Sequence, residues 1–109
     1  MTQTVLQFDF RHSGPWGTVM AARLKELAKD IAGEEGLAWK MWLEDREGGR
    51  AGGIYLFNDP VSAARYRRKH EDRLAALGIT EIEVRSFEVN APLSIMTGAP
   101  VRPRFPAAA

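Results

Sequence analysis

A histidine that shares a helical stripe with apolar side chains is the residue best placed for chemistry in this sequence. Imidazole is the side chain whose ordinary pKa lies closest to neutrality, so His70 could take a proton from an acidic phenol or enol bound nearby. The alternative is a core histidine that bonds to a backbone carbonyl or to Tyr55, because buried polar groups usually find such partners. A spacing of three to four residues defines the stripe, which comprises Ala63, Tyr66, His70, Leu74 and Leu77.

Aromatic side chains supply the second feature with chemical potential. A pocket for a flat organic molecule needs aromatic walls and a few polar groups, although the same side chains could simply form core and interface. In a strand, Trp39 and Trp42 point to opposite faces, so at most one of them lines a given pocket. The other is expected at a dimer interface, where tryptophan is favoured. The aromatic-rich set comprises Phe8, Phe10, Met20, Trp39, Trp42, Tyr55 and Phe57.

The remaining polar residues carry weaker signals. Lys40 and Glu44 share the strand face of Trp42, and we expect an ordinary exposed pair or a pairing across a dimer interface. His12 follows the first predicted strand, near a sheet end where a pocket mouth could open. The basic run at residues 65–69 is followed at once by acidic residues, which indicates a solvated helix face rather than a nucleic-acid surface.

Composition excludes several classes of function. The chain has 109 residues, which suits one domain, and its net charge of +1 gives no global field for nucleic acid or membrane. It has no cysteine, and its two histidines match no metal-ligand spacing, so we expect no metal and no disulfide. No signal peptide or membrane-spanning run is evident, and we expect a cytoplasmic protein.

The predicted elements follow from periodicity and from turn chemistry. Residues 5–10 alternate as a strand, and Pro15 begins a helix whose apolar positions continue to Ile31. Residues 37–44 form a second strand, and residues 53–57 form a third whose two faces both look apolar.

A second helix and a fourth strand complete the pattern. Asp59 caps the helix at Pro60, which runs to about Leu77 before Gly78, and residues 81–89 form the strand. The order strand–helix–strand appears twice, which implies a four-stranded sheet with two helices on one face. Because one layer of helices cannot cover both faces of the third strand, a second copy of the chain is expected to cover the other. We expect a domain at residues 1–97 and a Pro/Ala-rich arm or tail at residues 98–109.

Several of these segments together resemble the YdhR family of small monooxygenases. The match runs from about residue 4 to residue 96. It rests on residues 6–8 (LQF), 14–17 (GPWG), 36–42 (GLAWKMW), 51–57 (AGGIYLF), His70 with Arg73 and Leu74, and 89–94 (VNAPLS).

The resemblance implies a ferredoxin-like βαββαβ fold of the α+β class. It also implies a homodimer that packs sheet against sheet, the dimeric α+β barrel. Related barrel oxygenases act on polycyclic phenols or anthrones without flavin, haem or metal. In that scheme the protein binds an electron-rich aromatic compound and helps to remove a proton, and the substrate carbanion then reacts with dioxygen.

Carried to this sequence, the resemblance implies His70 as proton acceptor or anion stabiliser and a hydrogen bond from the Tyr55 hydroxyl to a substrate oxygen. The implied partners are a small aromatic substrate and dioxygen, with no cofactor. The walls of the pocket would be Trp39, Tyr55, Phe8, Met20 and Tyr66.

Three other functions remain open from the sequence. A dimer that binds an aromatic molecule without chemistry needs the pocket but no ionisable His70. A haem-degrading enzyme of the same superfamily would place an asparagine on the first strand, where this chain has Gln7 and Asp9. A barrel that serves only for assembly would have no dry cavity between its helices and its sheet.

Overall fold

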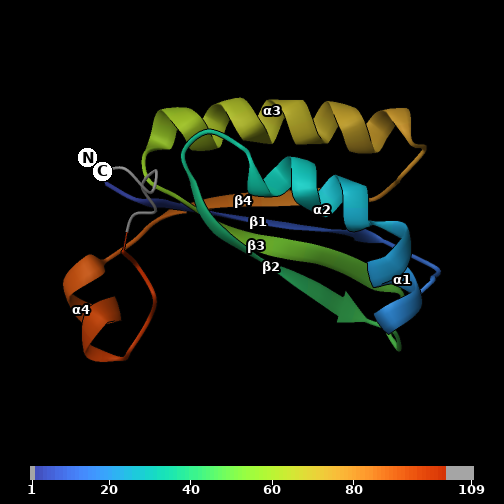
Figure 1. Ribbon diagram of the computed structural model, residues 1–109, viewed down its shortest axis with the longest axis horizontal. Coiled ribbons are helices and arrows are strands. Elements are labelled where there is room, and N and C mark those ends of the chain that lie inside the picture. The colour runs from blue at the N-terminus through green and yellow to red at the C-terminus, as the bar shows by residue number, and fades with distance from the viewer. Residues whose placement is uncertain (1, 103–109) are drawn as a thin grey trace.

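One antiparallel sheet of four strands carries the fold, with the strands in the order β2-β3-β1-β4. The computed structural model describes residues 2–102 of the chain, and Figure 1 shows its helices and strands. The elements are β1 (Thr4–Arg11), α1 (Gly17–Arg23), α2 (Lys25–Ala32), β2 (Leu37–Asp45), β3 (Arg50–Phe57), α3 (Pro60–Ala76), β4 (Glu83–Glu88) and α4 (Ala91–Met96).

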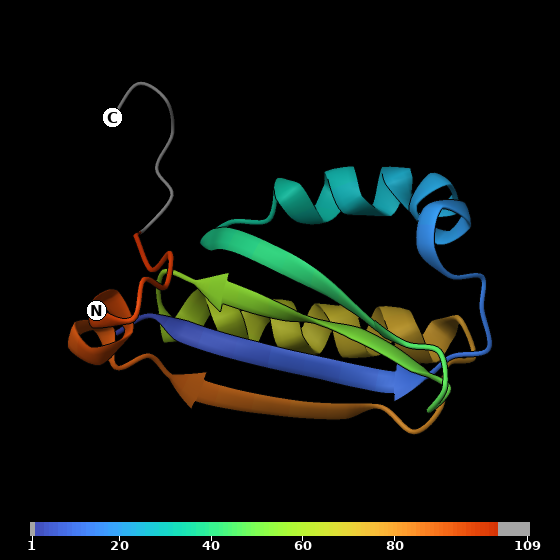
Figure 2. The same ribbon diagram turned by 90° about the horizontal axis from the view of Figure 1, so that it is seen from below.

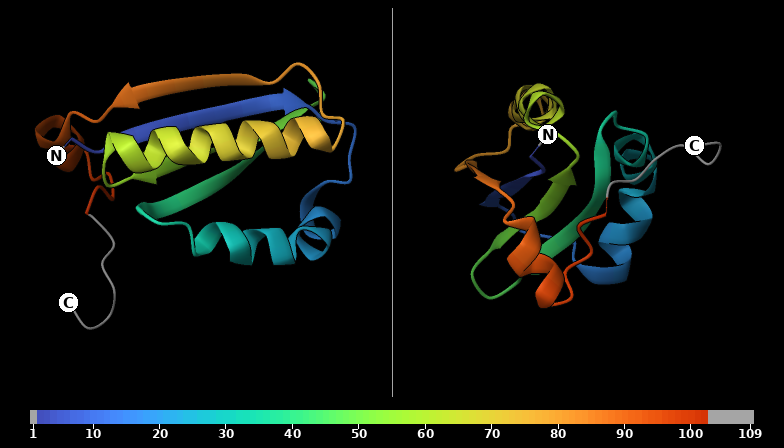
Figure 3. Two further views of the ribbon diagram at one scale, coloured as in Figure 1. Left: turned by 90° about the horizontal axis from the view of Figure 1, so that it is seen from above. Right: turned by 90° about the vertical axis from the view of Figure 1, so that its left-hand side faces the viewer.

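The helices α1, α2 and α3 lie on one face of the sheet. Helix α3 packs against β1 and β3, whereas α2 packs against the edge strand β2. Figures 2 and 3 show α3 across the middle of the sheet and the α1–α2 pair displaced toward β2. The opposite face of the sheet is left without a helical layer among the described residues. This arrangement confirms the predicted α+β, ferredoxin-like fold.

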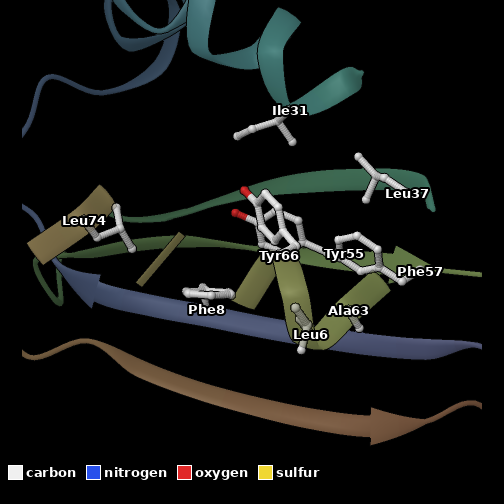
Figure 4. Close-up of a cluster of buried hydrophobic side chains, with 9 residues drawn as sticks. All are labelled: Leu6, Phe8, Ile31, Leu37, Tyr55, Phe57, Ala63, Tyr66 and Leu74. Carbon is white, nitrogen blue, oxygen red and sulfur yellow. The ribbon is translucent and has the colours of Figure 1, made fainter. Parts of the chain in front are cut away.

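The core forms where α3 meets the central strands. Leu6 and Phe8 of β1 point toward the helices, as the alternation predicted, and both are buried. Tyr66 of α3 lies 5.1 Å from Tyr55 and 5.4 Å from Phe57, measured between ring centroids. Figure 4 shows this cluster, with the Tyr55 and Tyr66 hydroxyl oxygens on the same side. Aromatic packing therefore fixes α3 firmly to the sheet.

Local chemistry sets the ends of α3 as the sequence predicted. The Asp59 carboxylate accepts a hydrogen bond from the Ser62 backbone N–H at 2.7 Å, and Pro60 occupies the first turn. This bond holds the pKa of Asp59 below its usual value. Gly78 follows the helix with φ +78°, the left-handed conformation that glycine adopts without strain.

The first predicted helix differs from the observed one. Its first turn begins at Gly17 rather than Pro15, and it divides into α1 and α2 at Leu24, whose φ and ψ are −99° and 11°. The amide of Leu24 still bonds to the Met20 carbonyl at 2.9 Å, so the two segments remain joined by a helical hydrogen bond.

Strands β3 and β4 also differ from the predicted ranges, and one helix was not predicted. Strand β3 begins at Arg50 rather than Gly53, because residues 50–53 pair fully with β1, and the Arg50 side chain bonds to Asp9 at 2.6 Å. Strand β4 is shorter than predicted, at residues 83–88. Helix α4 was not predicted, although Asn90 caps it by accepting from the Leu93 N–H at 3.2 Å.

The predicted arm at residues 98–109 is described only as far as Arg102. The Trp39 indole N–H donates to the Pro100 carbonyl at 2.7 Å, so this described part returns to the sheet. Residues 103–109 lie outside the described residues. No helix among residues 2–102 is long and apolar enough to cross a membrane.

Candidate functional site

A cavity of about 130 Å³ lies where α1, α2 and α3 meet the sheet. Its walls are mainly apolar, and polar groups reach it from β2, from α3 and from the loop after β1. An engineered apolar cavity of about 150 Å³ holds a benzene molecule, so this volume suits a single ring. The lining residues are Phe10, His12, Met20, Leu24, Leu27, Lys40, Trp42, Gly52, Tyr55, His70, Leu74, Leu77 and Ile79.

His70 enters the cavity wall from α3 in a defined tautomer. Its side chain is buried, and its Nδ1 atom lies 3.2 Å from Nε of Arg73 and 3.0 Å from a second guanidinium nitrogen. Arginine only donates, so Nδ1 accepts and the proton of the neutral ring resides on Nε2. Burial, together with the charges of Lys40 and Arg73, lowers the pKa of His70 to about 3. His70 is therefore a neutral hydrogen-bond donor near pH 7.

Lys40 enters the same wall from β2 and lies on aromatic rings. Its Nζ atom is 3.3 Å from the ring centroid of Trp42 and 4.5 Å from that of Tyr55. A Cβ atom at Gly53 would lie 2.7 Å from Cε of Lys40, so the glycine leaves room for the lysine stem across the sheet. Burial and then the charge of Arg73 lower the pKa of Lys40 to about 7.

The two tyrosines complete the polar part of the site. Burial is the main cause that raises the pKa of Tyr55, and it also raises the pKa of Tyr66. The Tyr66 hydroxyl accepts from Arg73 at 3.3 Å. Arg73 in turn pairs with Asp30 of α2 at 3.1 Å, which links the two helices above the cavity. The Tyr55 hydroxyl also donates a hydrogen bond to the Tyr66 hydroxyl, so both phenols remain protonated.

His12 lies at the end of the cavity near β1. Its Nε2 atom donates to the Pro15 carbonyl at 2.8 Å, and its ring packs edge-on against Trp16 at 4.8 Å. The sequence placed His12 near a possible pocket mouth, and the structure confirms that position.

A second hollow of about 290 Å³ adjoins the cavity beneath α1. Both spaces share Met20, Leu24 and Trp42 in their walls. Glu44 faces this hollow and accepts from the Gly17 backbone N–H at 2.8 Å. The expected pairing of Glu44 with Lys40 is therefore absent from residues 2–102, because the carboxylate binds the start of α1 instead.

The structure brings together some of the predicted site residues and separates others. Met20, Tyr55 and His70 line the cavity. Phe8 and Tyr66 lie behind its wall in the aromatic core, where Phe8 is 5.0 Å from the His70 ring.

Trp39 does not belong to the cavity, and that placement was wrong. Trp39 pairs with Leu56 and Lys40 pairs with Tyr55, so Trp39 points to the open face of the sheet. The sequence separated the two tryptophans correctly, and the resemblance assigned Trp39 to the pocket, but Trp42 is the one that lines the cavity. A shift of one residue in register exchanges the faces of a strand, and alternation alone cannot decide between them.

Lys40 is the functional candidate that the sequence missed. The sequence predicts an exposed residue there, because a lysine between two tryptophans carries no signal of burial. Gly52 and Gly53 on the neighbouring strand, which pair with Leu43 and Trp42, were the available hint, since strand positions without side chains leave space above them.

The fold and the cavity define a ferredoxin-like α+β protein with an aromatic-walled pocket of small-molecule size. A family model described as "Putative mono-oxygenase ydhR" matches residues 5–100. The chain belongs to this YdhR family. No curated protein matches the chain in sequence.

Two solved structures are similar in fold. One is a protein of unknown function from Nitrosomonas europaea, with a TM-score of 0.58 and 16% identity, covering 83% of this chain and 91% of that one. The other is described as "a putative antibiotic biosynthesis monooxygenase" from Deinococcus radiodurans. It has a TM-score of 0.54 and 16% identity, covering 80% of this chain and 92% of that one. At this identity the likeness shows the fold alone.

Proposed function

We propose that the protein is a cofactor-independent monooxygenase of a small aromatic, phenolic or quinol-like compound, bound between the helices and the sheet. The observation that carries the proposal is one apolar cavity that holds both the buried His70 and the Lys40 amine. Membership of a monooxygenase family supports the reaction class. A role in assembly alone would leave no such cavity, so the cavity argues against that alternative.

In this proposal His70 stabilises the substrate anion. His70 fits the role of proton acceptor poorly, because its Nδ1 atom already accepts from Arg73 and its low pKa makes the ring a weak base. The Nε2–H group can donate to an oxygen that gains negative charge. Such a donor in a water-poor site acts more strongly than it would in water.

The two adjoining hollows suggest the shape of the substrate. One ring fits the inner cavity beside Tyr55, and a second ring would extend past Met20 and Trp42 into the space beneath α1. In this proposal the Tyr55 hydroxyl turns from Tyr66, its hydrogen-bond partner, to donate to a substrate oxygen. The proposed substrate is therefore a flat compound of one to three rings with at least one acidic hydroxyl.

Oxygen uptake by the purified protein tests the proposal. The protein is treated with chelator and offered a panel of anthrones, quinols and catechols. We expect protein-dependent uptake that survives the chelator and falls by about 10²–10³-fold in His70→Ala, the scale for loss of an oxyanion donor. Arg68→Ala, on the exposed side of α3, serves as the matched control. If no compound is consumed while tryptophan fluorescence still changes on binding, the protein is a binding dimer instead.

We also propose that two copies join through the open sheet face. Met41, Leu43 and Phe87 expose 52%, 37% and 43% of their surface, and Met41 and Phe87 point away from the helices. Val5, on the same face, pairs with Leu56 at the centre of the sheet. An exposed apolar face of this kind is typical of a protein–protein interface, and a second copy of the chain presents the same face to pair with it.

Light scattering at a series of protein concentrations measures the oligomeric state. We expect a dimer for the native chain and a monomer for Met41→Lys, because the charge would be buried unpaired at the interface. Val61→Lys, on the exposed side of α3, should stay dimeric. A dimer that persists in Met41→Lys with unchanged affinity would place the interface elsewhere.

A further inference from the structure

We propose that the Lys40 amine accepts the proton of a phenol or enol bound in the cavity and then holds the resulting oxyanion as an ion-pair partner. The inference rests on the proposed function, since it takes this cavity as the substrate site. It goes beyond that function by naming the proton acceptor and by restricting the substrates to weak oxygen acids.

The position of the Lys40 side chain is the first observation that supports the proposal. Its Nζ atom lies over the rings of Trp42 and Tyr55, and among residues 2–102 no carboxylate forms an ion pair with it. The nearest candidate on its own strand face, Glu44, binds the start of α1. Aromatic faces attract a cation, but they do not replace an anionic partner. The amine therefore faces the cavity without a counter-ion.

The charges around the cavity favour an anion in it. From α3 come the Arg73 guanidinium and the neutral His70, and from β3 comes the protonated Tyr55. From α2, Asp30 pairs with Arg73 at 3.1 Å and so offsets part of its charge. On the β1 side, His12 donates to the Pro15 carbonyl. The polar groups around the cavity, apart from the paired Asp30, are thus mainly donors or cations.

The proton transfer balances without any co-reactant. The O–H bond of the bound compound breaks, a fourth bond forms at Nζ, and the electron pair stays on the oxygen. Burial lowers the pKa of Lys40, so the amine can be neutral when the ligand binds, and an oxyanion beside it raises that pKa again. The amine is therefore a base that becomes stronger only when an acidic ligand is present.

Ligand ionisation can be read directly with 4-nitrophenol, because its phenolate absorbs visible light and its phenol does not. Bound to the native protein, it should ionise at a pH at least about one unit below that of the free compound, a tenfold change in its acid constant. In Lys40→Met it should ionise above the free value, because an apolar cavity disfavours an unpaired anion. Lys29→Met, which removes an exposed lysine of α2, should behave as the native protein does.

A second measurement compares the binding of two ligands that differ in one acidic proton. The methyl ether 4-nitroanisole has a similar shape but no acidic proton, so it should bind at least about tenfold more weakly than 4-nitrophenol at neutral pH. In Lys40→Met the two compounds should bind alike, which also shows that the cavity is intact. Equal binding of both compounds to the native protein, or unchanged nitrophenol ionisation in Lys40→Met, would overturn the proposal.

This test is separate from the oxygenation test. The ionisation of 4-nitrophenol needs no dioxygen, so it can succeed even if no compound of the panel is oxidised. Conversely, oxygen uptake that is equal in the native protein and in Lys40→Met would leave the oxygenase in place and remove Lys40 from its role.

Discussion

The two helical units on the covered face of the sheet are built differently. Helix α3 packs Ala63, Tyr66, His70 and Leu74 directly on the central strands, and all four are buried. The α1–α2 pair buries only Ile31 fully. Its other apolar residues, such as Met20 and Leu24, are half-buried beside the two hollows.

The comparison shows why the cavity lies where it does. A helix that presents aromatic rings to the sheet fills the space between them, whereas a helix pair displaced to the edge strand leaves part of that space open. His70 and Tyr55 come from the well-packed side of the site, whereas Lys40 and the apolar Met20 and Leu24 come from the more loosely packed side. The donor His70 is thus held by the element that packs most closely on the sheet.

Matched leucine truncations give the largest expected contrast. Leu74→Ala on α3 should lower the free energy of unfolding by roughly 2–5 kcal/mol, because its side chain is buried in the core cluster. Leu24→Ala, whose side chain is only half-buried, should cost about 1 kcal/mol. Urea unfolding measures both, and equal losses would show that the two units are packed alike.

A lower pH should destabilise the folded protein through His70 of α3. The folded pKa of about 3 lies below the ordinary value of 6.5, so between these values the unfolded chain binds a proton that the folded chain does not. The free energy of unfolding should therefore fall as the pH decreases, by up to about 1.4 kcal/mol per unit, or about 2 kcal/mol between pH 6.5 and 5. Subtracting the curve of His70→Gln isolates this contribution, and a flat difference would contradict it.

Removal of the Lys40 charge should stabilise the protein. The folded pKa of about 7 lies below the ordinary 10.5, so the charged form is disfavoured by folding, and this cost fades as the pH rises from 7 to 10.5. Lys40→Met should raise the free energy of unfolding at neutral pH by roughly 1–2 kcal/mol. Thermal unfolding at several pH values measures it; a loss of stability instead would mean that Lys40 supports the fold.

The helix caps give the smallest effect. Asp59→Ala should cost about 1 kcal/mol, because one amide of the first turn of α3 loses its acceptor. Asp72→Ala, an exposed acid near the other end of the same helix, should change stability by less than about 0.5 kcal/mol. Helix α1 begins at Gly17, and its N-cap residue Trp16 makes no side-chain cap hydrogen bond, so α1 has no equivalent bond to lose.

The sequence by itself determined most of the fold. Alternation in β1, the Asp59–Pro60 start of α3 and the stripe that buries His70 depend on local spacing, and the structure confirms each of them. The family could be recognised from short segments that together span the chain.

Only the tertiary structure decided which side chains meet in the cavity. The strand pattern separated Trp39 from Trp42, but the pairing of β2 with β3 assigned Trp42 and Lys40 to the helices. The environment of Lys40 likewise depends on Tyr55 and Arg73, which lie on other elements. Local periodicity fixes the relative orientation of neighbours along one strand, whereas register and burial are properties of strands and helices that meet only in the folded chain.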